Sequence, residues 1–94
     1  MSKKISIFRI EKTAENEIIL WGKLPKGKTQ QELVFKAAKE ISKMTELFYG
    51  CSVKINGVLT DAINCMLGHA LSNVCRSVSV FDPKENAYIL CIYH

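Results

Sequence analysis

An amphipathic stretch from Thr29 to Phe48 constrains the fold more than any other part of the 94-residue chain. Thr29 and Glu32 have the spacing of a capping box, in which each side chain accepts a hydrogen bond from the other residue's backbone amide. Gly50 follows where a left-handed residue often closes a helix. We therefore expect one long helix whose single apolar face must be covered. That face consists of Val34, Ala37, Ala38, Ile41, Met44 and Phe48.

Runs rich in β-branched and aromatic residues lie on both sides of this helix and predict strands. The expected strands are Ile5–Ile10, Glu17–Leu24, Cys51–Ile55, Ser77–Phe81 and Ala87–His94, with polar turns at 13–16 and 82–86. A second helix is expected from a cap at Thr60 to about Cys75, with Ile63, Leu67, Ala70, Leu71 and Val74 facing the core. The predicted fold class is α/β: one domain over residues 1–94, of order ββαβαββ, with a mixed five-stranded sheet that is parallel in its middle.

Composition narrows the class of protein. Hydrophobic residues make up 48% and charged residues 23% of the chain, which is typical of a globular protein and too polar for a membrane span. The net charge of +4 suits an anionic ligand, but most lysines fall at positions expected to be solvated. No dense run of Lys and Arg with interleaved aromatics marks a nucleic-acid binder. We expect a cytoplasmic protein that binds neither membranes nor duplex DNA.

The four cysteines form neither a C-x-x-C pair nor the alternating Cys/His spacing of a zinc site, and we expect them to be reduced and mostly buried. The second helix is apolar on both sides, because Cys65, Met66, Gly68 and His69 lie opposite its core face. A helix that is apolar all round is usually covered on both sides. On so small a domain the second cover is most simply another subunit, with His69 at or beside the interface.

Asn56-Gly57 follows a strand and precedes a helix, where open α/β sheets bind ligands, and Thr60 adds a hydroxyl. Asn-Gly is equally an ordinary turn. Asp82, at the next strand end, offers a carboxylate beside a ligand, with Lys84 reaching phosphate. Asp before Pro is also a common turn former. These residues therefore predict either a ligand-binding end of the sheet or two plain turns.

His69 and His94 are the two histidines, and histidine is the side chain that titrates nearest to neutral pH. Residues three apart on a strand point to opposite faces, so Cys91 and His94 should not share a metal ion. The same alternation puts His94 on the face of Leu90 and Ile92. Asp82 and His94 fall at opposite ends of a predicted hairpin, roughly 23 Å apart. Either one of them is structural or the site is assembled from more than one subunit.

Taken together, four segments within residues 53–94 resemble one family, the small CRISPR-associated ring nucleases of type III systems, which are manganese-dependent relatives of the CRISPR-associated Rossmann-fold sensors. The segments are Ile55-Asn56-Gly57, Leu67-Gly68-His69-Ala70, Val78-Ser79-Val80-Phe81-Asp82-Pro83-Lys84 and Ile92-Tyr93-His94. The resemblance implies a minimal Rossmann-like domain that forms a homodimer or a ligand-bridged tetramer. It also implies a phosphodiesterase that linearises cyclic tetra-adenylate, an RNA-like second messenger, and so switches off antiviral signalling.

By position, the resemblance implies catalytic roles for His69, Asp82 and His94, with Mn²⁺ held by Asp82 and His94. Ligand binding falls to Lys84 together with the strand-to-helix residues Asn56, Gly57 and Thr60. Lys84 and Val58 stand where the family has arginines, and lysine lacks the bidentate fork of arginine. Three alternatives remain open: a non-catalytic sensor or sponge for the same ligand, an RNA 3′-deadenylase as the family was earlier described, and an interaction module whose second helix mediates assembly.

Overall fold

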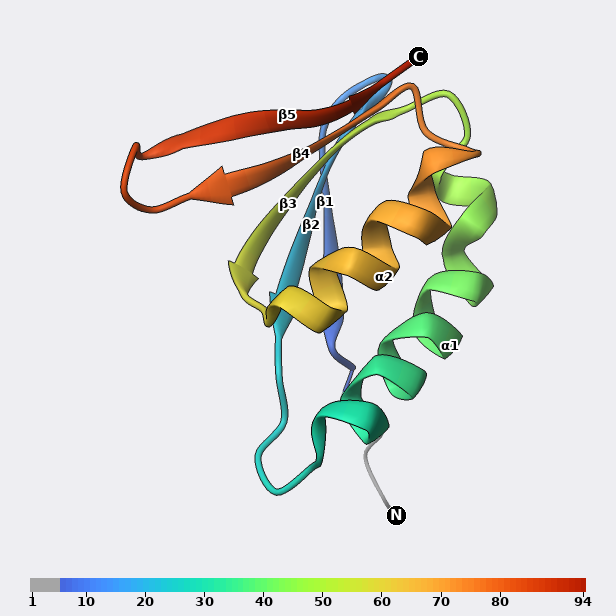
Figure 1. The fold of residues 1–94 in the computed structure, drawn as a ribbon. Helices are drawn as coiled ribbons and strands as arrows, with labels where there is room; N and C mark the ends of the chain where they lie inside the picture. Colours follow the sequence, from blue (N-terminus) through green and yellow to red (C-terminus); the bar gives the residue numbers. More distant parts are fainter. Residues whose placement is uncertain (1–5) are drawn as a thin grey trace.

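The structure, a computed structural model, describes residues 6–94 and contains the predicted elements in the predicted order (Figure 1). They are β1 (Phe8–Ala14), β2 (Glu17–Lys23), α1 (Gln30–Phe48), β3 (Ser52–Val58), α2 (Asp61–Ser72), β4 (Ser77–Asp82) and β5 (Ala87–Tyr93). The α/β class, with one mixed five-stranded sheet and two helices, is confirmed. Residue 5, the first of the first predicted strand, lies outside the described residues.

The strands follow one another across the sheet in the order β1-β2-β3-β4-β5. The β2–β3 and β3–β4 pairs are parallel, and the outer hairpins β1–β2 and β4–β5 are antiparallel. The connections β2–α1–β3 and β3–α2–β4 each lead to the next strand in the same direction along the sheet. Because both connections have the same handedness, their helices lie on one face of the sheet, as Figure 1 shows for α1 and α2. The strand order never reverses. The sheet therefore lacks the crevice at a strand-order reversal where doubly wound folds bind nucleotides.

The core lies between the two helices and the sheet. From α1 it takes Leu33, Ala37, Ile41 and Phe48, and from α2 it takes Ile63, Leu67 and Leu71. Leu33 was not predicted for the helical stripe, whereas Val34 and Met44, which were, lie at its half-buried margin. A face about 100° wide accounts for this, because one residue step turns the helix by a similar angle. Within residues 6–94, neither helix has the length and hydropathy to cross a bilayer.

The helix ends follow the local signals only in part. Thr29 and Glu32 exchange the two capping hydrogen bonds, each of 3.2 Å, and these bonds hold the pKa of the Glu32 carboxyl below its usual value. The second helix ends at Ser72 rather than near Cys75, because the amides of Val74 and Cys75 both turn back to the Leu71 carbonyl. The β1 strand continues through Ala14, so the first turn is shorter than predicted.

Glu40, on α1, ties the helix to the start of β1. Its carboxylate accepts two 2.9 Å hydrogen bonds from the Ile7 amide and one of 2.7 Å from the Ser6 hydroxyl. Because hydrogen bonds to a charged group are among the stronger ones, Glu40→Ala is expected to lower the free energy of unfolding by about 2 kcal/mol. Glu46→Ala, on an exposed position of the same helix, should cost less than about 0.5 kcal/mol. Equal urea midpoints for the two variants would contradict this role.

The four cysteines are free, but only Cys51 and Cys75 are buried, so the prediction that most are buried was wrong for Cys65 and Cys91. Cys65 lies on the side of α2 that faces away from the sheet and is exposed. Cys91 is displaced by an irregularity in the β4–β5 pairing between Val78 and Ser79. Sequence alternation cannot foresee such an extra residue.

Thiol labelling should divide the cysteines into two classes. Burial, reinforced by the neighbouring Cys51, raises the pKa of the Cys75 thiol to about 12, so it is both hidden and protonated at pH 8. Ellman's reagent should therefore modify Cys65 and Cys91 rapidly in the folded protein and all four thiols only after denaturation. Mass spectrometry assigns the sites. Uniform labelling of all four without denaturant would contradict the structure.

Candidate functional site

A pocket of about 280 Å³ lies at the carboxyl end of β3, beside the start of α2 and the end of β4. It is lined by Ile55, Asn56, Gly57, Val58, Leu59, Asn64, Val80, Phe81 and Pro83. Two of the predicted ligand-binding residues, Asn56 and Gly57, are therefore in its wall, but they lie within β3 and not in a turn after it, so the predicted end of this strand at Ile55 was wrong. Thr60, Asp82 and Lys84 are chain neighbours of wall residues. The structure thus places two of the five predicted residues in the pocket wall and the other three next to wall residues in the chain.

Gly57 has a structural reason to be glycine. Its φ of +107° is one that side-chain-bearing residues rarely adopt. A Cβ atom here would overlap the carbonyl oxygen of Gly22 and lie 2.8 Å from its nitrogen, because the two glycines pair across β2 and β3. Close backbone packing therefore accounts for Gly57 whether or not a ligand approaches it.

The Asn56 side chain, on β3, is held by two hydrogen bonds. Its Nδ2 donates a 2.8 Å hydrogen bond to the Tyr88 hydroxyl on β5, and its Oδ1 accepts one of 2.6 Å from the Gly57 amide. Tyr88 was not predicted as part of the site. Side-chain alternation along the last predicted strand could have suggested its face, but not its partner across the sheet.

Thr60 and Asp82 each satisfy local backbone groups, as their simpler interpretations required. The Thr60 hydroxyl caps α2 by accepting a 3.4 Å hydrogen bond from the Ile63 amide. One carboxylate oxygen of Asp82 accepts a 2.9 Å hydrogen bond from the Lys84 amide and so forms the turn after β4. Asp61 adds a negative charge to the first turn of α2. That charge opposes phosphate binding at this helix start.

Asn64 is a pocket residue that the sequence did not single out. Its Oδ1 is buried and has no hydrogen-bond donor among the described residues. An unsatisfied buried acceptor costs about 1–3 kcal/mol, so a ligand N–H at this position would gain a partner already in place. The one available signal was a polar residue beside the core positions of an otherwise apolar helix.

Both histidines lie at the other end of the domain, at the carboxyl end of α2. The His94 ring donates from Nε2 to the Ser72 carbonyl, and the Ser72 hydroxyl donates a 2.9 Å hydrogen bond to the His69 carbonyl. Because a carbonyl only accepts, this contact assigns a proton to Nε2. Both side chains are exposed. Ser72 thus contacts the His94 ring and the His69 backbone, which places both residues near the carboxyl end of α2.

The environment predicted for His94 was wrong in one respect. Ile92 pairs with Val78 on the helix side of the sheet, but Leu90 pairs with Ser79 on the open side. The irregularity at Cys91 interrupts the alternation, so Leu90 and Ile92 do not share a face. His94 follows Ile92 toward the helices.

The two candidate metal ligands do not meet within one chain. Asp82 pairs with Ala87 at one end of the β4–β5 hairpin, and His94 follows Tyr93, which pairs with Ser77 at the other. Across residues 6–94, no three His, Cys, Asp or Glu side chains gather closely enough to hold a metal ion. Asp82 and His94 of one chain therefore cannot bind the same ion, and an ion shared by these two residues needs one of them from a second chain.

Comparisons with protein-family models, curated proteins and solved structures find no match for this chain. The functional interpretation therefore depends on the chain's own residues. Their arrangement is bipolar: a pocket lined by the Asn56 and Asn64 amides lies at the carboxyl end of β3, and two exposed histidines lie at the other end of the domain.

Proposed function

We propose that the protein is a ring nuclease, a phosphodiesterase that binds and linearises cyclic oligoadenylate, with cyclic tetra-adenylate as the expected substrate. In this role it would switch off type III CRISPR signalling. One observation carries the proposal: His69, Asp82 and His94 coincide with the three positions of the family that residues 53–94 resemble. The bipolar arrangement supports it, because a ring held between two molecules would meet a binding end of one and a histidine end of the other.

The pocket chemistry supports an adenine-containing ligand. The unsatisfied Oδ1 of Asn64 is an acceptor for the exocyclic amine of adenine, since amide side chains pair with that base edge. Lys84 is exposed beside the pocket and supplies a positive charge for phosphate. Asn56 is held by Tyr88 and Gly57 and so presents a fixed amide to the ligand.

Cleavage requires only groups that the ring and the histidines carry. A 2′-hydroxyl of the ring attacks its adjacent phosphorus, and the bond from phosphorus to the 5′-oxygen breaks. One imidazole accepts the hydroxyl proton and another donates a proton to the leaving oxygen, giving a 2′,3′-cyclic phosphate and a 5′-hydroxyl. General acid–base catalysis of this kind contributes about 10²–10⁴-fold. His69 and His94, both exposed near the carboxyl end of α2, form the candidate pair.

The proposal includes a homodimer, and a tetramer when the ligand bridges two dimers. A manganese ion belongs in it only as an ion shared between chains, with Asp82 from one chain and His94 from another. When bound, such an ion would neutralise phosphate charge. The acid–base steps assigned to the histidines do not depend on it.

The direct test is a cleavage time course of cyclic tetra-adenylate with purified protein, in the presence and absence of Mn²⁺. The proposal expects linear products with 2′,3′-cyclic phosphate ends. Their absence from both reactions would overturn the enzymatic function. Faster shortening of a linear 3′-oligoadenylate tail would instead identify a deadenylase.

A second candidate is a non-catalytic sensor or sponge for the same ligand. It is favoured by Lys84 and Val58, which stand in place of two family arginines and cannot supply the bidentate fork that arginine offers to phosphate. Calorimetry beside the cleavage assay separates the two, because a sponge binds the ring tightly and releases no product.

A further inference from the structure

The sheet face turned away from the helices carries a row of side chains that spans all five strands. Pairing aligns Arg9 with Trp21 and Trp21 with Asn56, and it aligns Phe81 with Tyr88. Asn56 and Phe81 each follow the paired residues Ile55 and Val80 and line the same pocket, which joins the two halves. We call these five residues the aromatic row: Arg9, Trp21, Asn56, Phe81 and Tyr88.

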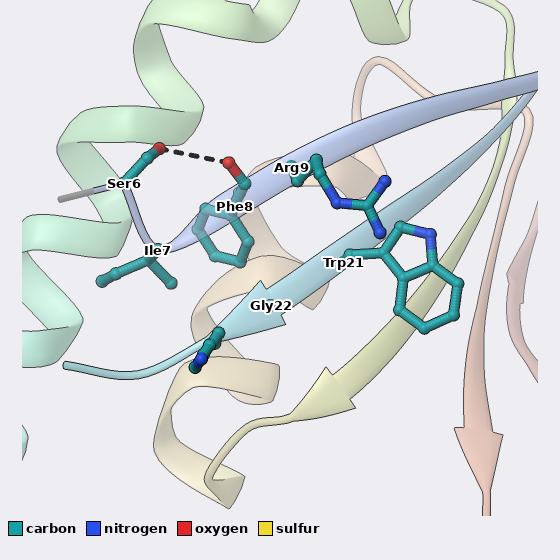
Figure 2. A pocket seen from close by; sticks show the side chains of 7 residues that line it. Ser6, Ile7, Phe8, Arg9, Trp21 and Gly22 are labelled. Atoms are coloured by element: carbon teal, nitrogen blue, oxygen red, sulfur yellow. Dashed lines mark hydrogen bonds between the residues drawn. The ribbon is translucent and has the colours of Figure 1, made fainter.

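Cations and ring edges pack against the aromatic faces of this row. The Arg9 guanidinium lies 5.5 Å from the centre of the Trp21 ring, an arrangement visible in Figure 2. The Lys54 ammonium lies 5.3 Å from the centre of the Tyr88 ring, and Phe81 meets that ring edge-on at 5.4 Å. Arginine stacked on an aromatic ring is a platform on which a further planar group can stack.

Charge is unevenly distributed on this face. The acidic residues Glu11 and Glu17 pair with positions nearer the β1–β2 turn, and Glu17 is engaged by Lys54 at 2.7 Å. No described strand residue on this face carries a carboxylate at the aromatic row, or one position further toward Lys23. The half of the face that carries the aromatic rings is therefore the basic half.

The polar residues of the central strands argue against a second copy as the cover. Two sheets packed face to face exclude water and interdigitate apolar side chains about 10 Å apart. Such packing would bury the Lys54 ammonium and the Ser79 hydroxyl, and taking a charge out of water costs several kcal/mol even when it is paired, as Lys54 is with Glu17. A hydrated ligand with flat π-faces and negative charges fits the same residues without that cost.

We propose that the aromatic row binds single-stranded RNA. The bases stack on the rings of Trp21, Phe81 and Tyr88, and the phosphates lie beside Arg9 and Lys23. Four strand spacings of about 4.8 Å give the row a length near 19 Å. Sheet surfaces of comparable extent stack two or three bases. This inference goes beyond the proposed function, because the ligand is a linear strand and no bond is cleaved.

Trp21 makes the row directly observable, since it is the single tryptophan of the chain. Its indole Nε1 is buried without an acceptor among the described residues. Arg9, Trp21 and Lys23 line a cavity of about 560 Å³ at the β1 end of the row (Figure 2). Base stacking there should quench the fluorescence of Trp21.

In one titration an unlabelled linear oligoadenylate of about ten nucleotides is added to the protein and Trp21 fluorescence is recorded. In a second titration the protein is added to the same oligonucleotide carrying fluorescein, and its anisotropy is recorded. Trp21 fluorescence should fall as anisotropy rises, and the logarithm of affinity should fall with that of salt by about 0.7 for each phosphate contacted. Arg9→Glu should weaken binding at least about tenfold. Lys39→Glu, the same charge change on exposed α1, should alter it less than about twofold.

Several results would overturn the proposal: no quenching by RNA, equal loss of binding in both variants, or equal affinity for duplex RNA. Sedimentation of the wild type and Arg9→Glu supplies another arm, because a dimer that dissociates on this substitution would identify a second copy as the cover. Cleavage of cyclic tetra-adenylate is measured on the same samples. Loss of RNA binding with cleavage intact would refute the row alone, and RNA binding without cleavage would refute the nuclease alone.

Discussion

His69→Ala is expected to lower the rate of cyclic tetra-adenylate cleavage by about 10²–10⁴-fold, the usual contribution of a general acid or base. The side chain is exposed on α2, and the hydrogen bond from Ser72 reaches only its backbone carbonyl, which alanine keeps. The substitution should therefore leave folding intact. The affinity of the variant for cyclic tetra-adenylate, measured by calorimetry, should stay within about threefold of the wild-type value. The pocket lies at the carboxyl end of β3, whereas His69 lies near the carboxyl end of α2.

Cys65→Ala is the matched control for His69, since Cys65 is exposed on the same helix one turn earlier. It should leave cleavage unchanged. A wild-type rate in His69→Ala would remove His69 from the mechanism. A parallel loss of melting temperature and activity would instead assign it a structural role. His94→Ala is less clean, because it also removes the contact to the Ser72 carbonyl.

Gly57→Ala should have the largest effect on stability. The added methyl group would overlap the Gly22 backbone, which belongs to a paired central strand and cannot move like a flexible side chain. Together with the strained φ of +107°, we expect a loss of at least about 3 kcal/mol in unfolding free energy. In a domain of this size that lowers the melting temperature by about 12–24 °C.

Gly50→Ala separates the two causes. Gly50 also has a positive φ, of 69°, but a Cβ there would meet no atom within 4 Å. It should cost only the left-handed backbone penalty of about 1–2 kcal/mol. Equal melting temperatures for the two variants would contradict the close approach of Gly57 to Gly22. If the folded fraction of Gly57→Ala still binds cyclic tetra-adenylate, this glycine is needed for packing and not for ligand binding.

The features predicted correctly from the sequence are those set by neighbouring residues. The capping box of Thr29 and Glu32, the spacing of apolar residues behind it and the β-rich runs on both sides were enough to give the order of elements. The separation of Asp82 from His94 also followed, because a hairpin fixes which residues lie at its two ends. Each of these depends on contacts within one element or one turn.

The features that were missed depend on register between distant strands. The irregularity at Cys91 moved Leu90 to the open face and left Cys91 exposed, and one extra residue carries no local signal. The aromatic row is dispersed over the whole chain, so no run of basic and aromatic residues announced it. The contact between Asn56 and Tyr88 likewise crosses the sheet.

The resemblance to Rossmann-fold proteins left the shape of the ligand site open, because that shape depends on the order of the strands. The sequence predicted strands, helices and a parallel middle, all of which are present, but not the order of strands across the sheet. That order runs from β1 to β5 without reversal. The pocket at the end of β3 is therefore a hollow between one strand end, one helix start and the β4–β5 turn rather than a crevice between diverging loops.

The central claim is that the pocket end of one chain works with the histidine end of another. Mixing His69→Ala with Lys84→Glu tests it most directly, because each variant damages a different end. If composite sites form between chains, the mixture should recover about one quarter of the wild-type cleavage rate, since random pairing joins an intact pocket to an intact histidine end in that fraction of sites. A mixture no more active than the separate variants would contradict the claim.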